Sequence, residues 1–273
     1  MKKKFAIIGN PITHSLSPVL HNYWFEKYNV EANYSLLNVE EKDLIETIKK
    51  IRNKEINGIN VTLPYKQKII PFVDQLVNDA KLTNSVNTIF LDNTNTVIGE
   101  NTDVFGLQAA YLKEITSAEN KKALVIGAGG VSPSVIFSLQ KSKITNITTV
   151  NRTREKSIFL KKRFNFLHVL DWKSLPKELS NFDIIINATS LGLKDGVDFD
   201  FNFENVKDKA IYIDTIYNPL ETKTLKFLKE KNIKTFNGLN MFIYQGQKTF
   251  YLWNKINPEI DDKLIDLLVS KLK

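Results

Sequence analysis

The sequence contains no cysteine and only three histidines. Without cysteine, the chain can form no disulfide framework, no thiolate nucleophile and no cysteine-ligated metal site, which suits a reducing compartment. The histidines, His14, His21 and His168, lie in different segments and offer no evident cluster of metal ligands. We therefore expect a protein that needs no metal.

The sequence also lacks a long hydrophobic run at its start. The basic residues of MKKK are followed by an apolar stretch that Asn10, Pro11 and His14 interrupt before it reaches the roughly 7 to 15 residues of a signal peptide. With 42% hydrophobic and 25% charged residues, the composition is close to the average of soluble globular proteins. We expect a cytoplasmic protein that does not bind a membrane.

The formal net charge is +8, which raises the alternative of nucleic-acid binding. The lysines are spread along the chain, however, and the aromatic residues fall at core-like positions instead of alternating with basic residues. The charge therefore predicts a field that attracts small anions and no nucleic-acid partner. A strong, salt-sensitive mobility shift with DNA or RNA would overturn this hypothesis.

A chain of 273 residues is long enough for two domains, because most domains have about 100 to 150 residues. Apolar runs and alternating patterns predict an α/β first domain in a β-α-β rhythm that ends in a hairpin around residues 92–95. Its expected strands are 5–8, 34–39, 59–62, 86–91 and 96–98, and its expected helices are 18–28, 44–51, 65–72 and 76–81.

The second half of the chain predicts a parallel sheet. A helix at 105–115 leads to a series of apolar strands separated by helices or loops, for which parallel strands with crossover helices are the economical interpretation. The expected strands are 123–126, 147–150, 184–187 and 211–214. Two strongly patterned helices, at 239–255 and 260–272, complete the α/β chain.

The glycine-rich segment GAGGVS, residues 127–132, follows an apolar strand and precedes a helix, which is the context in which such a segment binds a dinucleotide. Gly127 permits the tight turn and Gly129 lets the backbone approach the phosphates. Ser132 allows close packing of the helix, and Pro133 suits a first helical turn because it donates no backbone hydrogen bond. The alternative is a tight strand-to-helix turn without a ligand.

The end of the next strand carries Asn151, Arg152 and Thr153, where an NAD-specific site would usually have Asp or Glu for the ribose hydroxyls. Arg152 can pair with the 2′-phosphate of NADP and lie over the adenine, and Asn151 and Thr153 can hydrogen-bond to the phosphate. Lys156 or Arg154 can add positive charge. The segment predicts NADP, with a solvated basic helix start as the alternative.

Two serines lie between the first strand and the first helix. Pro18 suits the first helical position and Ser17 suits the cap, so a helix cap alone is one interpretation. Beside the exposed N–H groups of a helix start, the hydroxyls of Ser15 and Ser17 would also hold a carboxylate.

Lys66 ends the segment NVTLPYK, residues 60–66, in which Pro64 forces the chain out of the sheet. A solitary lysine is usually a solvated surface charge. Lys66 is nevertheless our catalytic candidate, because several polar residues lie at strand or hairpin ends that can converge on one cleft. These residues are Asn60, Asn87, Asn101 and Asp103. Asp103 can cap a helix that starts at Val104 and still face Lys66.

Taken together, the ordered motifs resemble those of shikimate dehydrogenases along almost the whole chain. They are GNPITHSLSP at 9–18, NVTLPYK, GENTD at 99–103, GAGGVS, NRT at 151–153, NATSLGL at 187–193 and MFIYQGQ at 241–247. The resemblance implies a Rossmann-type NADP-binding domain at 104–238. It also implies a discontinuous α/β substrate-binding domain made of 1–103 and 239–273.

The resemblance also implies roles for single residues. In the family, the lysine and aspartate that match Lys66 and Asp103 form a catalytic dyad: the lysine passes the proton to or from the substrate hydroxyl, and the aspartate orients it and binds substrate hydroxyls. Ser15 and Ser17 match the ligands of the shikimate carboxylate. The remaining substrate ligands are Thr62, Asn87, Tyr217 and Gln245, with Asn60 as a weaker candidate and a packed aromatic as the alternative for Tyr217.

The implied cofactor site covers the glycine-rich loop and four later segments. Its residues are Gly127, Ala128, Gly129, Gly130, Val131, Asn151, Arg152, Thr153, Lys156, Thr189, Ile216 and Gly238. Gly238 matches the position whose backbone contacts the nicotinamide amide. In the family a second arginine is common near Lys156, so the phosphate clamp is expected to be looser here. Val104, Leu193 and Asn240 also depart from the family pattern, but none of them removes a proposed catalytic group.

The resemblance implies NADP-dependent, reversible reduction of 3-dehydroshikimate to shikimate, in chorismate and aromatic amino acid biosynthesis. Two alternatives stay open: a quinate/shikimate dehydrogenase of broader specificity, and a non-catalytic NADP-binding sensor on the same fold. The small-molecule substrate is the expected partner, and the sequence leaves the oligomeric state open, with a homodimer as one alternative.

Overall fold

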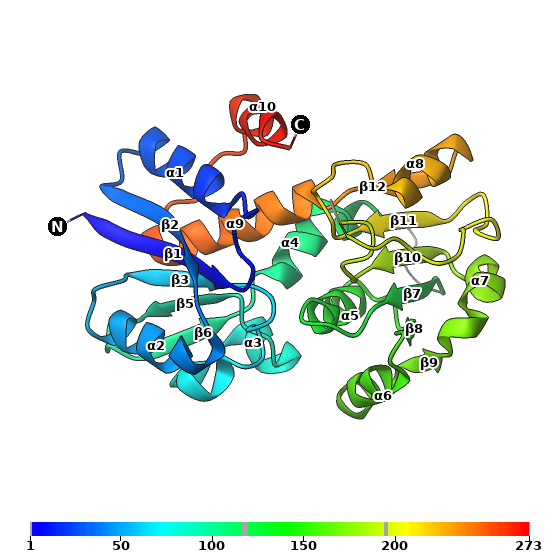
Figure 1. Ribbon diagram of the computed structural model, residues 1–273, viewed down its shortest axis with the longest axis horizontal. Helices are drawn as coiled ribbons and strands as arrows, with labels where there is room; N and C mark the ends of the chain where they lie inside the picture. Colours follow the sequence, from blue (N-terminus) through cyan, green and yellow to red (C-terminus); the bar gives the residue numbers. More distant parts are fainter. Residues whose placement is uncertain (1, 116–119, 194–195, 273) are drawn as a thin grey trace. The chain divides into compact units, whose positions relative to one another are not determined.

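The computed structural model describes residues 2–115, 120–193 and 196–272 and divides into two compact units (Figure 1). The first unit is formed by Met1–Val104 and Ile243–Lys273, and the second by Phe105–Phe242. The sequence placed the corresponding boundaries after residues 103 and 238. The chain therefore leaves the first unit near the start of helix α4 (Asp103–Ala110) and returns to it within helix α9 (Leu239–Asn254).

The first unit contains a six-stranded mixed sheet in the order β2-β1-β3-β5-β6-β4. Its strands are β1 (Lys3–Gly9), β2 (Ala32–Asn38), β3 (Gly58–Val61), β4 (Gln75–Leu76), β5 (Thr88–Leu91) and β6 (Val97–Glu100). Strand β1 runs parallel to β2 and β3, and the predicted hairpin is present as the antiparallel pair β5–β6. Helices cover both faces of this sheet (Figure 1).

The helices of the first unit bury two different surfaces. On one face of the sheet, α2 (Leu44–Arg52) and α3 (Asn78–Thr83) contribute Leu44, Ile48, Ile51 and Ala80 to an aliphatic core with Ile8 and Ile59. The apolar residues of α2 recur every three or four positions, so they form one face of the helix. On the other face, α1 (Ser17–Lys27) and α9 form an aromatic core with Phe5 and Tyr34, and α10 (Asp262–Ser270) packs against α1.

The helix predicted at 65–72 is wrong. Its residues form turns and a single 3-10 turn at Ile70–Phe72. Pro71 explains the failure, because it has no N–H to donate and cannot lie in the interior of an α-helix that begins at Tyr65. The helix predicted at 76–81 starts later, at Asn78, because Gln75–Leu76 pairs as a short strand with β6.

The second unit confirms the predicted parallel sheet. Its six strands are β7 (Lys122–Ile126), β8 (Asn146–Val150), β9 (His168–Leu170), β10 (Ile184–Asn187), β11 (Ile211–Asp214) and β12 (Lys234–Phe236). All neighbouring pairs are parallel, in the order β12-β11-β10-β7-β8-β9. If β7 to β12 are renumbered 1 to 6 and the sheet is read from the β9 edge, the strand order is 3-2-1-4-5-6. This is the order of Rossmann dinucleotide-binding folds, in which the strand order reverses at the first strand, here β7.

The helices of the second unit are α5 (Ser132–Lys141), α6 (Arg154–Arg163), α7 (Leu175–Glu178) and α8 (Lys223–Glu230). Ala123, Val125, Ile184 and Ile186 contribute to one core, whereas Leu124, Ile126 and Ile185 contribute to the other. Because both faces are covered, the central strands are continuous apolar runs without alternation. Ligands of such folds bind at the carboxyl ends of the strands, where the glycine-rich segment follows β7.

Across the described parts of both units, none of the helices combines the length and the apolar composition that a membrane crossing requires.

Candidate functional site

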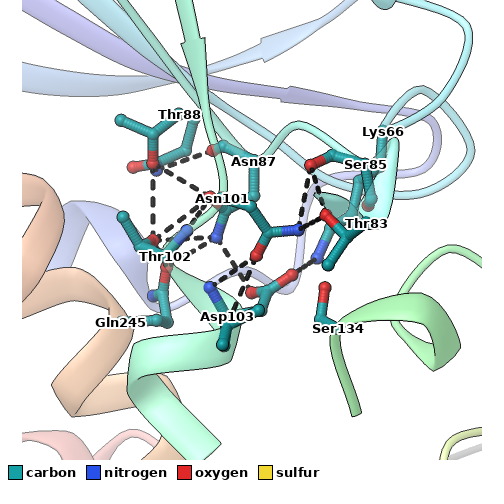
Figure 2. Close-up of polar contacts among 12 residues, drawn as sticks. Lys66, Thr83, Ser85, Asn87, Thr88, Asn101, Thr102, Asp103, Ser134 and Gln245 are labelled. Carbon is teal, nitrogen blue, oxygen red and sulfur yellow. Dashed lines mark hydrogen bonds and ion pairs between the residues drawn. The ribbon is translucent and has the colours of Figure 1, made fainter. Parts of the chain in front are cut away.

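Lys66 and Asp103 form a largely buried ion pair in the first unit (Figure 2). The distance between Lys66 Nζ and Asp103 Oδ2 is 2.6 Å, and the exposed fractions of the two side chains are 12% and 7%. Lys66 follows β3, and its carbonyl accepts a hydrogen bond of 2.8 Å from the backbone N–H of Val86, which fixes the turn. Lys66 is therefore not the solvated surface charge that a solitary lysine usually is.

Asn87 holds the other oxygen of the Asp103 carboxylate, with 2.9 Å between Asn87 Nδ2 and Asp103 Oδ1. The orientation of the Asn87 amide is determined by the backbone N–H of Thr102, which donates to Asn87 Oδ1 at 2.8 Å. Because a backbone N–H can only donate, the oxygen of the amide must face it. The amide nitrogen is thus left to donate to Asp103.

Asp103 was considered as the cap of a helix that starts at Val104, but Asn101 takes this position instead. Helix α4 begins at Asp103 itself, and Asn101 Oδ1 accepts hydrogen bonds from the backbone N–H groups of Asp103 at 3.0 Å and Val104 at 3.4 Å. Asn101 Nδ2 is held in turn by Thr83 Oγ1 and the Ser85 carbonyl, at 3.1 and 2.9 Å (Figure 2). The Asp103 carboxylate can therefore interact with Lys66 and Asn87.

The other predicted substrate ligands of the first unit differ in accessibility. Asn60 is only 4% exposed, and its amide is committed to the core through Tyr34 Oη at 2.7 Å and the Asn87 carbonyl at 2.9 Å. This geometry favours a positioning role for Asn60 over substrate contact. Thr62, just after β3, and Gln245, on α9, are half-buried, and Gln245 Oε1 lies 3.4 Å from Asn87 Nδ2.

Ser15 and Ser17 lie together at the start of α1, with 3.2 Å between their hydroxyl oxygens. Ser17 was considered as the helix cap, but it is the first helical residue, and Leu16 precedes it at the cap position. Instead, Ser15 Oγ accepts from the backbone N–H of Ser17 at 3.3 Å. The helix therefore starts one residue earlier than predicted, at Ser17 instead of Pro18, and the hydroxyls of Ser15 and Ser17 lie side by side.

In the second unit, the glycine-rich loop is shaped by two glycines for different reasons. Gly127 has φ +117°, and a Cβ atom there would lie 2.7 Å from the Ala188 carbonyl oxygen. A Cβ at Gly129 would meet no heavy atom of the described residues within 4 Å. Gly129 donates its N–H to Ser132 Oγ at 3.0 Å, and the buried Ser132 starts α5. The fold requires glycine at position 127, whereas position 129 offers room for a ligand.

Asn151 connects this loop to the segment after β8. Its Oδ1 accepts from the backbone N–H of Ala128 at 3.2 Å, and its Nδ2 donates to the Thr153 carbonyl at 2.9 Å. Arg152, Thr153 and Lys156 are exposed. Arg154, which was considered as an additional charge, forms an exposed ion pair with Asp171 at 2.7 Å.

Asn187 and Asp214 organise the carboxyl ends of β10 and β11. Asn187 Oδ1 accepts from the hydroxyl of Thr189 at 2.7 Å and from its N–H at 3.0 Å. Asp214 Oδ1 accepts from Asn187 Nδ2 at 3.1 Å and from the N–H of Ile216 at 3.0 Å. Burial raises the pKa of Asp214 to about 7. This pair fixes the positions of Thr189 and Ile216. The sequence analysis missed the pair, and the only feature that could have indicated it is that each of the two apolar strands ends in a polar residue.

Gly238 and Tyr217 lie in the same unit. A Cβ at Gly238 would lie 2.3 Å from the Thr215 carbonyl oxygen, so the close approach of two backbone segments requires glycine there. The ring of Tyr217 packs against that of Phe242 at 4.7 Å. Tyr217 thus belongs to the second unit, whereas the other predicted substrate ligands belong to the first.

Among the described residues, no group of three or more His, Asp or Glu side chains could hold a metal ion.

Comparison with known proteins gives consistent matches. The family model "Shikimate dehydrogenase substrate binding domain" matches residues 7–89, and the model "Shikimate / quinate 5-dehydrogenase" matches residues 110–194. The shikimate dehydrogenase (NADP(+)) of Pelagibacter ubique is 45% identical over 268 residues, which cover 98% of this chain and 99% of the relative.

Solved structures of shikimate dehydrogenases are similar to this chain over nearly its whole length. A crystal structure of a shikimate dehydrogenase in complex with NADP+ superposes with a TM-score of 0.91 at 34% identity, covering 100% of this chain and 96% of that one. The enzyme of Thermus thermophilus, in complex with NADP(H) and shikimate, gives a TM-score of 0.88 at 28% identity, with coverages of 99% and 100%.

Proposed function

Because the chain belongs to the shikimate dehydrogenase family, we propose that it catalyses the reversible, NADP-dependent reduction of 3-dehydroshikimate to shikimate, with Lys66 and Asp103 as its catalytic pair. The activity is that of a shikimate dehydrogenase (NADP(+)), an oxidoreductase of the shikimate pathway that leads to aromatic amino acids, and its cofactor is NADP. The observation that carries the roles of the residues is the buried contact of 2.6 Å between Lys66 and Asp103.

Lys66 moves the proton in this reaction. The bound cofactor supplies the hydride to the carbonyl carbon in the reductive direction. The Lys66 ammonium group donates a proton to the carbonyl oxygen, so that the ketone gains one hydride and one proton and becomes an alcohol. In the oxidative direction the neutral amine accepts the hydroxyl proton. Asp103 orients Lys66 by a direct hydrogen bond and is itself oriented by Asn87.

The first unit supplies most of the substrate ligands. The hydroxyls of Ser15 and Ser17 bind the shikimate carboxylate, beside the N–H groups at the start of α1. Thr62, Asn87 and Gln245 bind the ring hydroxyls together with Asp103, since an amide can donate to one hydroxyl and accept from another. Tyr217 is a further ligand in this proposal.

The second unit holds NADP. The backbone of residues 127–131 cradles the pyrophosphate, and the open space at Gly129 fits this role. Arg152 pairs with the 2′-phosphate, assisted by Thr153 and Lys156, all of which are exposed. Asn151 holds the loop against this segment, and Thr189, Ile216 and Gly238 receive the nicotinamide half.

The test is NADPH formation from shikimate and NADP+ by the wild-type protein, a Lys66→Ala variant and a Lys68→Ala control. Lys68 is an exposed lysine that pairs with Glu41. General acid–base catalysis contributes about 10²- to 10⁴-fold, so Lys66→Ala should lower kcat by that factor, and Lys68→Ala should not change it. Equal activities of the two variants would remove Lys66 from the mechanism.

Substrate breadth is decided by the same assay with quinate and NAD+. A broader quinate/shikimate dehydrogenase is the second candidate, because the second family model covers both substrates in its description. Comparable turnover of quinate or NAD+ would establish that candidate. Binding of shikimate and NADP+ without turnover would instead favour the non-catalytic sensor.

The cytoplasmic location stays a prediction, and the homodimer stays one alternative for the oligomeric state. Fractionation of the source cells tests the location, and the mass of the purified protein in solution tests the homodimer.

A further inference from the structure

Three buried threonine hydroxyls meet behind Asn87 in the first unit. Thr88 lies in β5, Thr102 lies just before α4, and Thr249 lies in α9. Thr249 Oγ1 is 2.9 Å from Thr88 Oγ1 and 3.1 Å from Thr102 Oγ1, and the last two are 3.4 Å apart. All three residues are at most 1% exposed. The three hydroxyls therefore lie within hydrogen-bond distance of one another, and we call this cluster the threonine triad.

The threonine triad contacts the substrate ligands directly. Thr102 Oγ1 lies 2.9 Å from Asn87 Nδ2 and 3.5 Å from Gln245 Oε1 (Figure 2). Thr88 Oγ1 donates to Asn87 Oδ1 at 3.1 Å. On the far side, Asn60 Nδ2 reaches Thr88 Oγ1 and Thr249 Oγ1 at 3.1 and 3.4 Å. The triad thus lies between the buried Asn60 and the two amides proposed to bind substrate.

Thr249 joins the helix that carries Gln245 to this network. Gln245 and Thr249 are four residues apart on α9, so both side chains lie on the same helix face. An apolar side chain of the same shape would fill the space at Thr249 equally well. A buried hydroxyl fixes direction as well as distance, because each hydrogen bond weakens when the donor and acceptor move out of line. The hydroxyl of Thr249 therefore sets where α9 lies relative to β5 and the start of α4.

We propose that Thr249 is a positioning residue for substrate recognition, which holds Gln245 and Asn87 in the geometry that binds the ring hydroxyls. The inference rests on the proposed function, since it assumes that Asn87 and Gln245 contact shikimate. Thr249 acts through these two amides and does not touch the reacting atoms. Its loss should therefore weaken substrate binding more than it slows proton transfer by Lys66.

The experiment compares Thr249→Val, which removes the hydroxyl and keeps the shape, with Thr249→Ser, which keeps the hydroxyl. We expect Thr249→Val to raise the KM for shikimate about tenfold, equivalent to about 1.4 kcal/mol. The KM for NADP+ should not change, and Thr249→Ser should recover most of the affinity for shikimate. Thr47→Val is the matched control, because Thr47 is also a buried helical threonine of the first unit, whose hydroxyl donates to the Asp43 carbonyl. It should lower the thermal midpoint and leave both KM values unchanged.

A second variant guards against misfolding of Thr249→Val. Thr88→Val removes the partner hydroxyl and should also raise the KM for shikimate, and the two effects should be less than additive because the residues share one network. The proposal is overturned if the folded Thr249→Val protein keeps the wild-type KM, or if Thr249→Ser is impaired equally. Should the wild-type protein fail to turn over shikimate, the proposed function fails, and the dissociation constant for shikimate replaces KM as the readout for Thr249.

Discussion

At the level of single residues, the Lys66–Asp103 pair is difficult to explain by stability alone. Removing two charges from water costs several kcal/mol each, so a buried ion pair is weak evidence for stabilisation. Other pairs of this chain remain solvated, such as Lys49–Glu46 with exposed fractions of 57% and 59%, and such pairs contribute little. A pair that is buried, and whose carboxylate is additionally oriented by Asn87, is better explained by a role in chemistry.

A second buried residue, His21, determines how stability should respond to pH. It is fully buried in α1, and its ring stacks on Tyr34 at 4.6 Å. Neither ring nitrogen has a hydrogen-bond partner among the described residues. Burial lowers the pKa of His21 from 6.5 to about 3. The folded state therefore holds this imidazole in its neutral form.

From this we predict that acid destabilises the protein through His21. Below pH 6.5 the unfolded chain binds a proton that the folded chain does not, so the free energy of unfolding should fall by about 1.4 kcal/mol per pH unit as the pH decreases from 6.5 towards 3. A His21→Phe variant should lose this dependence. Urea denaturation at pH 7.5 and pH 5 measures it, with the exposed His168→Gln as control.

Asp214 contributes in the opposite direction: its pKa is raised to about 7, so its contribution to stability is lost as the pH rises towards 7. This contribution is the same in the wild-type protein and in His21→Phe, and it cancels when their free energies of unfolding are subtracted. An unchanged acid slope in His21→Phe would contradict the prediction.

At the level of elements, the segment after β8 should decide which nicotinamide cofactor is used. We predict that Arg152→Ala raises the KM for NADP+ about 10- to 100-fold, because a hydrogen bond to a charged group contributes about 1.5 to 3 kcal/mol. The KM for NAD+, which has no 2′-phosphate, should hardly change. Arg154→Ala is the matched control, since Arg154 is paired with Asp171. Equal losses for both cofactors, or an equal effect of Arg154→Ala, would exclude Arg152 as the phosphate ligand.

The sequence predicted strands that are continuous apolar runs, but it failed for strands of two or three residues and where one residue decides how a helix begins or ends. Strands such as β7 and β10 were predictable, because a short run of consecutive apolar residues is typical of a strand buried on both faces. The short strands β4, β9 and β12 were missed, since two or three residues show no period. Pro71 ended a predicted helix, and the caps assigned to Ser17 and Asp103 were wrong by one or two positions.

At the level of the whole molecule, motifs named the candidate site residues but not the contacts that hold these residues together. Lys66 and Asp103 could be named from local motifs, because each lies where a strand or hairpin ends. The threonine triad could not, since Thr249 lies 161 residues from Thr88 and 147 from Thr102 in the sequence. Nothing in the local pattern of α9 distinguishes Thr249 from an ordinary core residue. Such a network exists only after the chain has returned to the first unit.

The division of the proposed ligands between the two units predicts which segments each ligand should protect from amide hydrogen exchange. We expect shikimate alone to slow amide hydrogen exchange in residues 11–18 and 62–66 of the first unit, and NADP+ alone to slow it in residues 127–132 and 151–156 of the second. Openings that expel the ligand become rarer by the factor 1 + [L]/Kd, which is about 100-fold at 100 times Kd.

Mass-spectrometric exchange measures both effects in one experiment, and α2 and α8 serve as internal controls because they carry none of the proposed ligands. The Lys66→Ala variant should keep the NADP+ pattern, since Lys66 lies in the first unit. Protection of residues 127–132 by shikimate alone, without protection of residues 11–18, would reverse the assignment of the two units. That outcome would also exclude Ser15 and Ser17 as ligands of the carboxylate. A carboxylate bound at the start of α1 should protect the backbone amides there from exchange with water.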